Sequence, residues 1–396
     1  MWSYRKHQIE GAEWALHTIR TKGLAYLAWQ ERTNKTGTAL LTVENSKAKS
    51  ALIVTKKKAI PGWEEHLANL PLTKHYVVIN YESVHNIKRD FDFIILDESH
   101  HAISSTGKTS KTWKLVYKYT RGKPILYLSA TPYAEHVGLI YHQLKLSKWT
   151  PFKHRNFYDW FRAYGVSELT RTPYGLVETY TKYKDKEVLD ILKPYFNFKT
   201  RADVGIEHEP TVNVINIPMG GYNKKLIKQL QKDSVIEIEG HAPIICDSTM
   251  KLRMVHYQIE GGTIKTEDGY VTCGQEKIDY IKEHYEEEKI AVMAHFIAER
   301  KELSKRLSAK ILILSSDGHA EGVDLSHIDK LIIYSMSFKT SKYTQRLARQ
   351  ANHSRATPII VDILASNTPA IGYSIYQAVA LKKENFDNNS YKRIWE

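Results

Sequence analysis

The sequence predicts an α/β protein with two tandem parallel sheets, each flanked by helices, and three observations support this prediction. Short apolar runs bounded by turn residues alternate with helix-length amphipathic segments, as in strands that cross over through helices into a parallel sheet. The alternation occurs twice in 396 residues, a length that suits two domains of ordinary size. Polar residues follow the apolar runs, where parallel strands present ligands.

The first half contains five candidate strands and the second half contains four. Each is a nearly continuous apolar run, so we expect every strand to be buried on both faces of its sheet. The candidate strands span residues 24–29, 51–55, 76–80, 93–97 and 125–129, then residues 290–294, 311–314, 331–334 and 359–362. Aromatic and basic sequence between the two series predicts a helical insertion. The expected domains are residues 1–210, with the insertion from residue 133 onward, and residues 211–396.

The composition limits the possible classes of protein. With 42% hydrophobic and 26% charged residues and no apolar run near the ~18 residues of a membrane span, the sequence predicts a soluble cytoplasmic protein without a cleaved signal. Cys246 and Cys273 form no CxxC pair, so a thiolate zinc site is excluded and both are expected to pack in the core. The net charge of +13 favours a polyanionic partner, although many basic surfaces are simply solvated.

A candidate phosphate loop follows the first strand and precedes a helix-like segment. Such a loop needs inward backbone amides, a lysine for the phosphates and a hydroxyl for the metal, and these roles suit Lys35 and Thr36. The usual GxGKT pattern lacks its glycines here, but Asn34 tolerates a left-handed backbone. The predicted nucleotide-binding residues of the loop are Arg32, Thr33, Asn34, Lys35 and Thr36.

Two further strand ends carry polar groups. In a phosphate-hydrolysing site, Asp97 would hold Mg²⁺ through its water shell, while Glu98 would orient or deprotonate the attacking water. Ser129 and Thr131 end another strand and could hydrogen-bond this acidic pair. The alternatives are a solvated acidic turn and an ordinary strand end. The order of the three strand ends along one sheet favours a single nucleotide site, with Thr36 and Asp97 as magnesium ligands.

In this order the motifs resemble those of the superfamily 2 helicases, and within them the Swi/Snf-like DNA translocases with a DExH box, including compact phage versions. The resemblance implies two RecA-like lobes that hydrolyse ATP with Mg²⁺. It assigns adenine recognition to Arg5 and Gln8, and coupling to the second lobe to His100, Ser129 and Thr131. The resembling segments are residues 4–8, 51–63, 78–82, 97–100, 198–204, 289–296, 321–325 and 345–349.

Motifs V and VI of the family resemble residues 321–325 and 345–349. The resemblance assigns ATP-site roles to Gly322, Asp324, Gln345 and Arg349. Arg349 matches the arginine finger, a cation that stabilises charge developing on the γ phosphate. The family's second arginine is Asn352 here, so either Arg355 or Arg346 substitutes for it or the contact is absent.

A translocase is expected to hold the nucleic-acid backbone, because base contacts would fix it in place. The predicted nucleic-acid-binding residues are Thr55, Lys56, Lys57, Tyr81, Lys108 and Lys339. For any single lysine, a solvated surface is the alternative. The aromatic and basic stretch at residues 152–162 could stack on bases, but its helical spacing favours core packing. His100 and His101 lack a spaced third ligand, so we reject a metal site there.

Together these features predict a nucleic-acid-stimulated ATPase, a DNA helicase or translocase. We expect a monomer that acts on duplex, single-stranded or branched DNA in replication, recombination or repair, including fork or branch remodelling, and in the host cytoplasm if it is phage-encoded. Three alternatives stay open: a translocase that never separates long duplexes, a nucleic-acid-binding protein with a decayed ATP site, and an RNA helicase.

Overall fold

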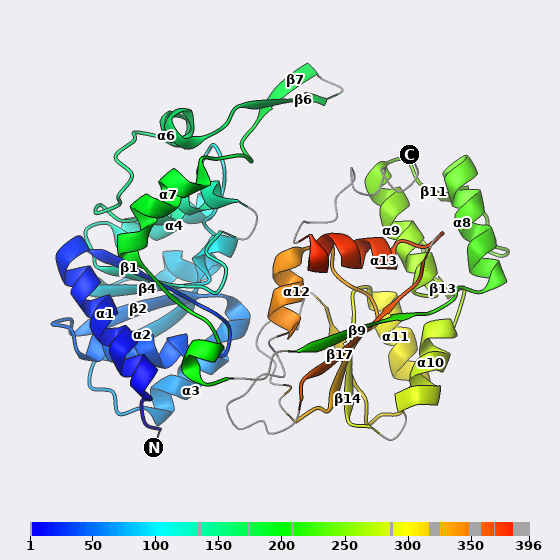
Figure 1. Ribbon diagram of the computed structural model, residues 1–396, viewed down its shortest axis with the longest axis horizontal. Coiled ribbons are helices and arrows are strands. Elements are labelled where there is room, and N and C mark those ends of the chain that lie inside the picture. The colour runs from blue at the N-terminus through cyan, green and yellow to red at the C-terminus, as the bar shows by residue number, and fades with distance from the viewer. Residues whose placement is uncertain are drawn as a thin grey trace. The chain divides into compact units, whose positions relative to one another are not determined.

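The chain forms two compact units, Met1–Ile206 and Glu207–Glu396. The structure is a computed structural model that describes residues 2–133, 136–172, 175–206, 210–285, 288–316, 325, 327–347, 358–367 and 369–382. Each unit contains one parallel sheet flanked by helices (Figure 1). The predicted α/β class, two tandem RecA-like units with parallel sheets, is therefore confirmed.

The first unit is built on a six-stranded parallel sheet with the order β3-β2-β4-β5-β1-β8. Its strands are β1 (Leu24–Trp29), β2 (Ser50–Thr55), β3 (His75–Asn80), β4 (Phe93–Asp97), β5 (Ile125–Leu128) and β8 (Phe196–Lys199). Ile125 pairs with both Leu24 and Ile94, so β5 lies between β1 and β4 and their carboxyl ends meet at one edge. The inner strands are buried on both faces as predicted. Strand β3, at the edge of the sheet, is only half-buried. The expectation that every strand is buried on both faces is therefore wrong for β3.

Helices cover both faces of this sheet. They are α1 (Lys6–Lys22), α2 (Lys35–Glu44), α3 (Ile60–Asn69), α4 (Lys111–Thr120), α5 (Ile140–Leu144), α6 (Phe157–Tyr164) and α7 (Asp185–Leu192). The first three pack against one core cluster, which contains Trp29 and Trp63. The last four pack against the other, which is rich in aromatic side chains such as Trp160 and Phe161. These aromatic residues are buried, as their helical spacing predicted.

The insertion of the first unit contains a β-hairpin as well as helices, which corrects the prediction of a purely helical segment. Strands β6 (Glu168–Thr172) and β7 (Gly175–Thr179) pair antiparallel and extend away from the sheet (Figure 1). Strand β6 contains two threonines, and β7 contains a valine and a threonine, residue types that favour extended backbone. Leu169 and Leu176 are exposed, so this hairpin lacks the buried face by which sequence patterns reveal a strand.

The second unit is built on a five-stranded parallel sheet with the order β15-β14-β16-β17-β9. Its strands are β9 (Thr211–Asn216), β14 (Ile290–Ala294), β15 (Leu312–Ser315), β16 (Lys330–Ile333) and β17 (Ile360–Ala365). Strand β9 precedes the predicted series and was missed, as was β8 in the first unit. Both are edge strands with mixed polar and apolar residues, so neither forms an apolar run.

Helices and two small hairpins complete the second unit. The helices are α8 (Gly221–Asp233), α9 (Thr249–Glu260), α10 (Glu276–Tyr285), α11 (Ile297–Arg306), α12 (Thr340–Leu347) and α13 (Gly372–Tyr376). The hairpins are β10 (Val235–Ile236) with β11 (Ile244–Ile245), and β12 (Thr263–Lys265) with β13 (Tyr270–Thr272). Cys246 is buried and Cys273 is half-buried; both are free thiols.

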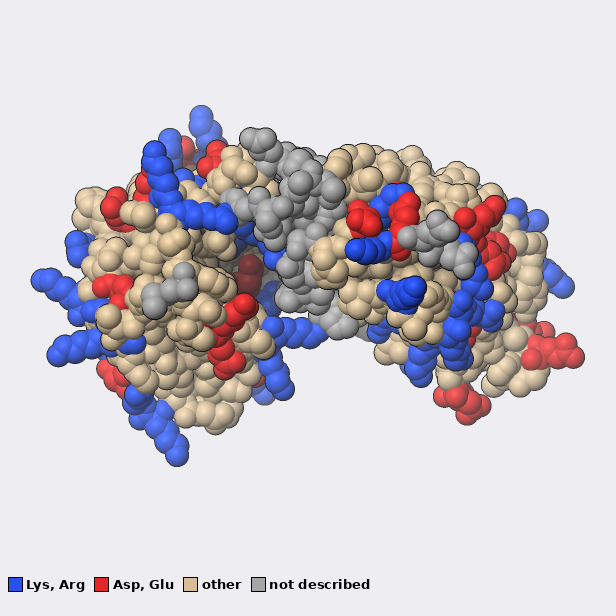
Figure 2. Space-filling view, turned by 90° about the horizontal axis from the view of Figure 1, so that it is seen from below, with Lys and Arg blue, Asp and Glu red and all other residues tan. Residues whose placement is uncertain are grey.

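Charged side chains are spread over both units. Lys and Arg project from each unit on the face in Figure 2, with acidic side chains between them. Within the described parts of the chain, no helix combines the length and apolar character needed to cross a bilayer.

Candidate nucleotide-binding site

The loop after β1 adopts the backbone of a glycine-rich loop without its glycines. Arg32 has a φ of 67°, and Asn34, at the start of α2, has a φ of 62° and a ψ of 41°. These are the two positions at which the sequence departs from GxGKT. A left-handed conformation costs an ordinary residue roughly 1–2 kcal/mol, and asparagine less. The loop therefore keeps its shape under strain, most of it at Arg32.

The lysine of this loop lies over the carboxyl end of β1. The Lys35 ammonium donates hydrogen bonds to the carbonyl oxygens of Trp29 at 2.7 Å and Gln30 at 3.0 Å. The Thr33 hydroxyl donates to the same Gln30 carbonyl at 2.7 Å, and the His7 ring contacts the Thr33 carbonyl at 3.1 Å. Helix α1 and the strand end thus both hold the loop in place. Thr36 is half-buried in the first turn of α2.

Asp97 ends β4 in a buried polar setting. One carboxylate oxygen, Oδ2, accepts hydrogen bonds from the Thr55 hydroxyl at 2.7 Å and the Trp63 indole at 2.9 Å. The Tyr81 hydroxyl donates to the Asp97 backbone carbonyl at 2.9 Å. Burial, and next the neighbouring charge of Glu98, raise the pKa of Asp97 to about 6. Thr55 and Tyr81 are buried and support Asp97 here, which revises the nucleic-acid contact predicted for their side chains.

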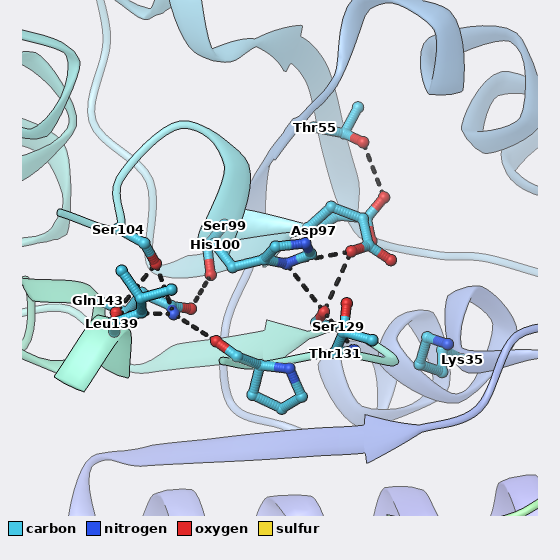
Figure 3. A network of polar contacts seen from close by, with 12 residues as sticks. Lys35, Thr55, Asp97, Ser99, His100, Ser104, Ser129, Thr131, Leu139 and Gln143 are labelled. Carbon is cyan, nitrogen blue, oxygen red and sulfur yellow. Dashed lines mark hydrogen bonds and ion pairs between the residues drawn. The ribbon is translucent and has the colours of Figure 1, made fainter. Parts of the chain in front are cut away.

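Glu98, His100 and Ser129 form a polar cluster where β4 and β5 end. Figure 3 shows His100 and Ser129 of this cluster side by side. The Ser129 hydroxyl donates to Glu98 Oε2 at 3.1 Å and lies 3.0 Å from His100 Nδ1. His100 Nδ1 also lies 3.3 Å from Glu98 Oε2. The backbone N–H of Thr131 donates to the Ser129 hydroxyl at 3.0 Å. The structure thus brings Glu98 of the acidic pair together with Ser129, as predicted. The Thr131 hydroxyl, which was expected to bond the acidic pair as well, is buried without a hydrogen-bond partner among the described residues.

Gln143 on α5 is a buried connection that the sequence did not reveal (Figure 3). Its side-chain oxygen accepts from the Ser99 hydroxyl at 2.7 Å and the Tyr26 hydroxyl at 3.1 Å. Its amide nitrogen donates to the Ser104 hydroxyl at 2.8 Å and the Pro132 carbonyl at 2.7 Å. One side chain therefore joins the segment after the acidic pair to the segment after Ser129. A single glutamine in a short helix gives no sequence signal for this role.

A cavity of about 490 Å³ lies beside the phosphate loop. It is lined by Trp2, Ser3, Tyr4, Arg5, Gln8, Asn34, Gly37, His66 and Leu70. Gln8 accepts from the Arg5 backbone N–H at 2.9 Å and donates to the Asn34 carbonyl at 3.4 Å. A Cβ at Gly37 would lie 2.5 Å from the Gln8 amide nitrogen, so glycine permits this close approach. Aromatic walls and a fixed amide suit a planar heterocycle.

A second cavity, of about 830 Å³, is larger but lies elsewhere. Gly23, Phe93 and Pro124 line it, at the amino ends of β1, β4 and β5. Parallel sheets present ligands at their carboxyl ends. The smaller cavity, adjacent to Lys35, is therefore the better candidate for a nucleotide base.

The predicted ligands of Mg²⁺ fit a hydrated ion. Asp97 uses Oδ2 for its two hydrogen bonds, which leaves Oδ1 for the water shell of a cation. Thr36 is the hydroxyl residue directly after Lys35 in the loop. The described residues contain no group of three or more His, Cys, Asp or Glu side chains that could enclose a metal by themselves.

Most of the predicted ATP-site residues of the second unit lie outside the described residues. This holds for Gly322, Asp324 and Arg349, and for the side chain of Gln345 on α12. Arg346 on the same helix is buried, and its guanidinium donates two hydrogen bonds to the Ser316 carbonyl, at 2.7 and 2.9 Å. Both of these hydrogen bonds lie within the second unit.

Four of the predicted nucleic-acid-binding residues are lysines. Lys57, Lys108 and Lys339 are exposed, whereas Lys56 is half-buried and its ammonium group is buried. Lys56 and Lys57 follow β2, and Lys108 precedes α4, so these three lie in the first unit. Lys339 lies just before α12 in the second unit.

Fold and site together define the class of the first unit. It is a RecA-like unit with a lysine loop after its first strand and an acidic pair at the end of β4. Residues 29–134, which span the loop, the acidic pair and Thr131, match the family described as "Type III restriction enzyme, res subunit". Over this stretch the match confirms the resemblance to superfamily 2 helicases.

Two solved structures from Sulfolobus solfataricus are similar to the whole chain. The SWI2/SNF2 ATPase core in complex with dsDNA is 16% identical, with a TM-score of 0.45, and the match covers 100% of this chain and 95% of that chain. The SWI2/SNF2 ATPase core domain is 14% identical, with a TM-score of 0.44, and the match covers 97% and 89%. A search of curated protein sequences gives no match.

Proposed function

We propose that this chain is an ATP-dependent DNA translocase or helicase. The observation that carries the proposal is the convergence of Lys35, Asp97, Glu98 and Ser129 at adjacent strand ends of one parallel sheet. The family match over residues 29–134 supports it, since that stretch contains all four residues.

ATP would bind across the loop and the smaller cavity. Arg5 and Gln8 would face the adenine base, and the backbone amides of residues 32–36 would surround the phosphates. Lys35, now bonded to two carbonyls, would turn toward the β and γ phosphates and exchange those bonds for charged ones. Tyr4 also lines this cavity. Its hydroxyl is buried and has no hydrogen-bond partner among the described residues.

Hydrolysis would use the two carboxylates in different ways. Mg²⁺, when bound, neutralises charge on the phosphates. Asp97 would hold the hydrated ion, for which it must be ionised. Glu98 would orient or deprotonate the attacking water. Ser129 and His100 both contact Oε2 of the Glu98 carboxylate, so a shift of Glu98 in response to the γ phosphate would reach the segments after β4 and β5.

Movement would depend on the second unit. Gly322, Asp324, Gln345 and Arg349 would complete the ATP site, and Lys339 would contact the DNA backbone together with Lys56, Lys57 and Lys108. Differential binding in the ATP and product states would drive each cycle. We place the activity in DNA replication, recombination or repair, with fork or branch remodelling included. The monomeric state and the cytoplasmic location are further predictions.

The test is steady-state ATP hydrolysis without polynucleotide and with single-stranded DNA, duplex DNA, a forked junction or RNA. We expect DNA to stimulate turnover, and we expect Lys35→Ala to abolish it because the phosphates lose their cation. Lys47→Ala, an exposed lysine beyond the site, serves as the matched control. Stimulation by RNA alone would favour the RNA helicase, and undiminished turnover in Lys35→Ala would overturn the site.

The strained loop favours a second candidate, a nucleic-acid-binding protein with a decayed ATP site. Arg32 occupies a left-handed position that suits glycine. Arg32→Gly should therefore relieve strain and raise protein stability by about 1 kcal/mol, measured by urea unfolding. An active wild-type enzyme would exclude this candidate. If wild type binds ATP without turnover and only Arg32→Gly hydrolyses it, the decayed-site alternative is correct.

A further inference from the structure

A third cavity, of about 390 Å³, lies in the first unit outside the nucleotide site. Its walls are the segment before α4, the start of α4 and the start of α6, and its floor is α5. It is lined by Gly107, Lys108, Thr109, Trp113, Lys114, Tyr141, His142, Lys145, Arg155, Asn156, Phe157 and Tyr158. Of these, Lys108 is a predicted nucleic-acid contact, and residues 155–158 belong to the stretch 152–162 for which the sequence left base stacking open as an alternative to core packing.

The charge lining this cavity is entirely positive. Lys108, Lys114 and Arg155 are exposed at its walls, and Lys145 is half-buried in its floor. None of the four has a carboxylate partner among the residues that the structure describes. Burial lowers the pKa of Lys145, so a bound anion would stabilise its charged form. Four cations without counter-charges favour an anionic ligand.

The carboxylate on α6 beside this cavity is already paired with a cation. Asp159 lies one turn into α6, where it pairs with Arg162 and accepts a hydrogen bond from the Asn156 side chain at 3.0 Å. Helices α4 and α6 both begin at this cavity, which adds partial positive charge from their first backbone N–H groups. The charged side chains supply most of the attraction, and the helix starts add to it.

One aromatic ring at this cavity is exposed and unstacked. Tyr158 is 41% exposed, and its ring contacts with Phe157 and Tyr180 are T-shaped, at interplanar angles of 80° and 69°. Trp113, by contrast, is stacked on Tyr117 with ring centroids 4.8 Å apart. Tyr158 can therefore stack on a planar ligand, whereas one face of Trp113 is already covered.

We propose that this cavity binds one unpaired nucleotide of a DNA strand, with its base against Tyr158 and its phosphate among Lys108, Lys114 and Arg155. The volume exceeds the need of a phosphate ion alone and falls within the range of small-molecule sites. The cations at the walls are open to solvent, so adjoining phosphates of a continuous strand can reach them. This inference rests on the proposed function, because it supplies a hold on a single strand separate from the ATP site.

The test is binding of a fluorescent oligothymidylate and of an abasic oligonucleotide of equal length to the full chain, across a range of salt concentrations. Lys114→Ala and Arg155→Ala should each weaken binding to both oligonucleotides. Each should also reduce the slope of log K against log salt by about 0.7 per lost phosphate contact. Lys186→Ala on α7 removes one exposed charge away from the cavity and should leave the slope near that of wild type.

Tyr158 variants separate stacking from charge. Tyr158→Ala should weaken oligothymidylate binding on the order of ten-fold, whereas Tyr158→Phe keeps a ring and should bind like wild type. The abasic oligonucleotide should not distinguish the two variants. Tyr158→Phe also shows that a substitution at this position leaves the protein folded.

Three results would overturn the proposal. The first is that Lys114→Ala or Arg155→Ala binds both oligonucleotides as tightly as Lys186→Ala does. The second is that Tyr158→Ala weakens binding of the abasic oligonucleotide as much as binding of oligothymidylate. The third is that free dTMP competes for the protein as well as the oligonucleotide strand does. ATP turnover is measured in the same samples. If the cavity does not bind a nucleotide, DNA-stimulated ATP turnover should still be observed. If the proposed function is wrong, wild type itself should show no ATP turnover.

Discussion

At Asp97 burial and hydrogen bonding act in opposite directions on one carboxyl group. Desolvation and the Glu98 charge disfavour its ionised form, while Trp63, Thr55 and Lys35 favour it. The net result is a pKa raised to about 6. A residue proposed to hold a metal ion is thus kept partly protonated below neutral pH until a cation arrives.

The first prediction concerns Asp97→Asn. The folded protein binds a proton at Asp97 more tightly than the unfolded chain does, so this group lowers stability as pH rises from about 4 to about 6. Asn cannot ionise, so the variant should melt at a higher temperature than wild type above pH 6, with little difference near pH 4. It should also lose ATP hydrolysis. Equal melting temperatures at pH 8 would contradict this account.

At the start of α11, in the second unit, burial and hydrogen bonding likewise act in opposite directions on the carboxyl group of Glu299. Glu299 caps α11 by accepting the Phe296 N–H at 3.1 Å, and the Ser335 hydroxyl donates to the same oxygen, Oε2. Its other oxygen, Oε1, is buried without a hydrogen-bond partner among the described residues. A Cβ at Gly261 would lie 2.0 Å from it, so the two elements fit only with glycine there. Burial raises the pKa of Glu299 to about 7.

The second prediction is that Glu299→Gln stabilises the protein above pH 7. Ionisation of Glu299 lowers stability as pH rises from about 4.5 to about 7, because the folded form holds the proton more tightly. Gln keeps an oxygen for the cap and carries no charge. Urea unfolding at pH 5 and pH 8 measures the difference, with exposed Glu267→Gln as the control. A variant less stable than wild type at pH 8 would show that the charge itself is needed.

For the whole molecule, a formal net charge of +13 predicts that nucleic-acid binding weakens as salt increases, since bound phosphates release counterions. Each unit has its own parallel sheet and core clusters. The predicted ATP site nevertheless takes residues from both units, so we expect ATP turnover to need the complete chain.

The third prediction tests this dependence. Arg349→Ala should lower DNA-stimulated ATP turnover by about a thousand-fold or more, because an arginine finger stabilises charge only in the transition state. Equilibrium ATP binding should change little. Lys301→Ala, an exposed residue of α11, is the control for loss of one positive charge. Wild-type turnover in Arg349→Ala would remove the finger assignment.

The sequence by itself determined the α/β class, the inner strands and the strand ends that carry Lys35, Asp97, Glu98 and Ser129. These follow from local signals, namely apolar runs, their spacing and the polar residues after them. It could not reveal the edge strands β8 and β9, because polar residues interrupt both of them and neither forms an apolar run.

Only the tertiary structure decided which side chains support the site. Trp63 reaches Asp97 from α3, and Gln143 joins segments that lie up to 117 residues away in the chain. Thr55 and Tyr81, predicted to face nucleic acid, are buried beside Asp97. Such contacts depend on strand register and helix packing between distant segments. Such a hydrogen bond forms only after the distant segments pack together. The sequence around each of its two residues therefore contains no pattern that predicts it.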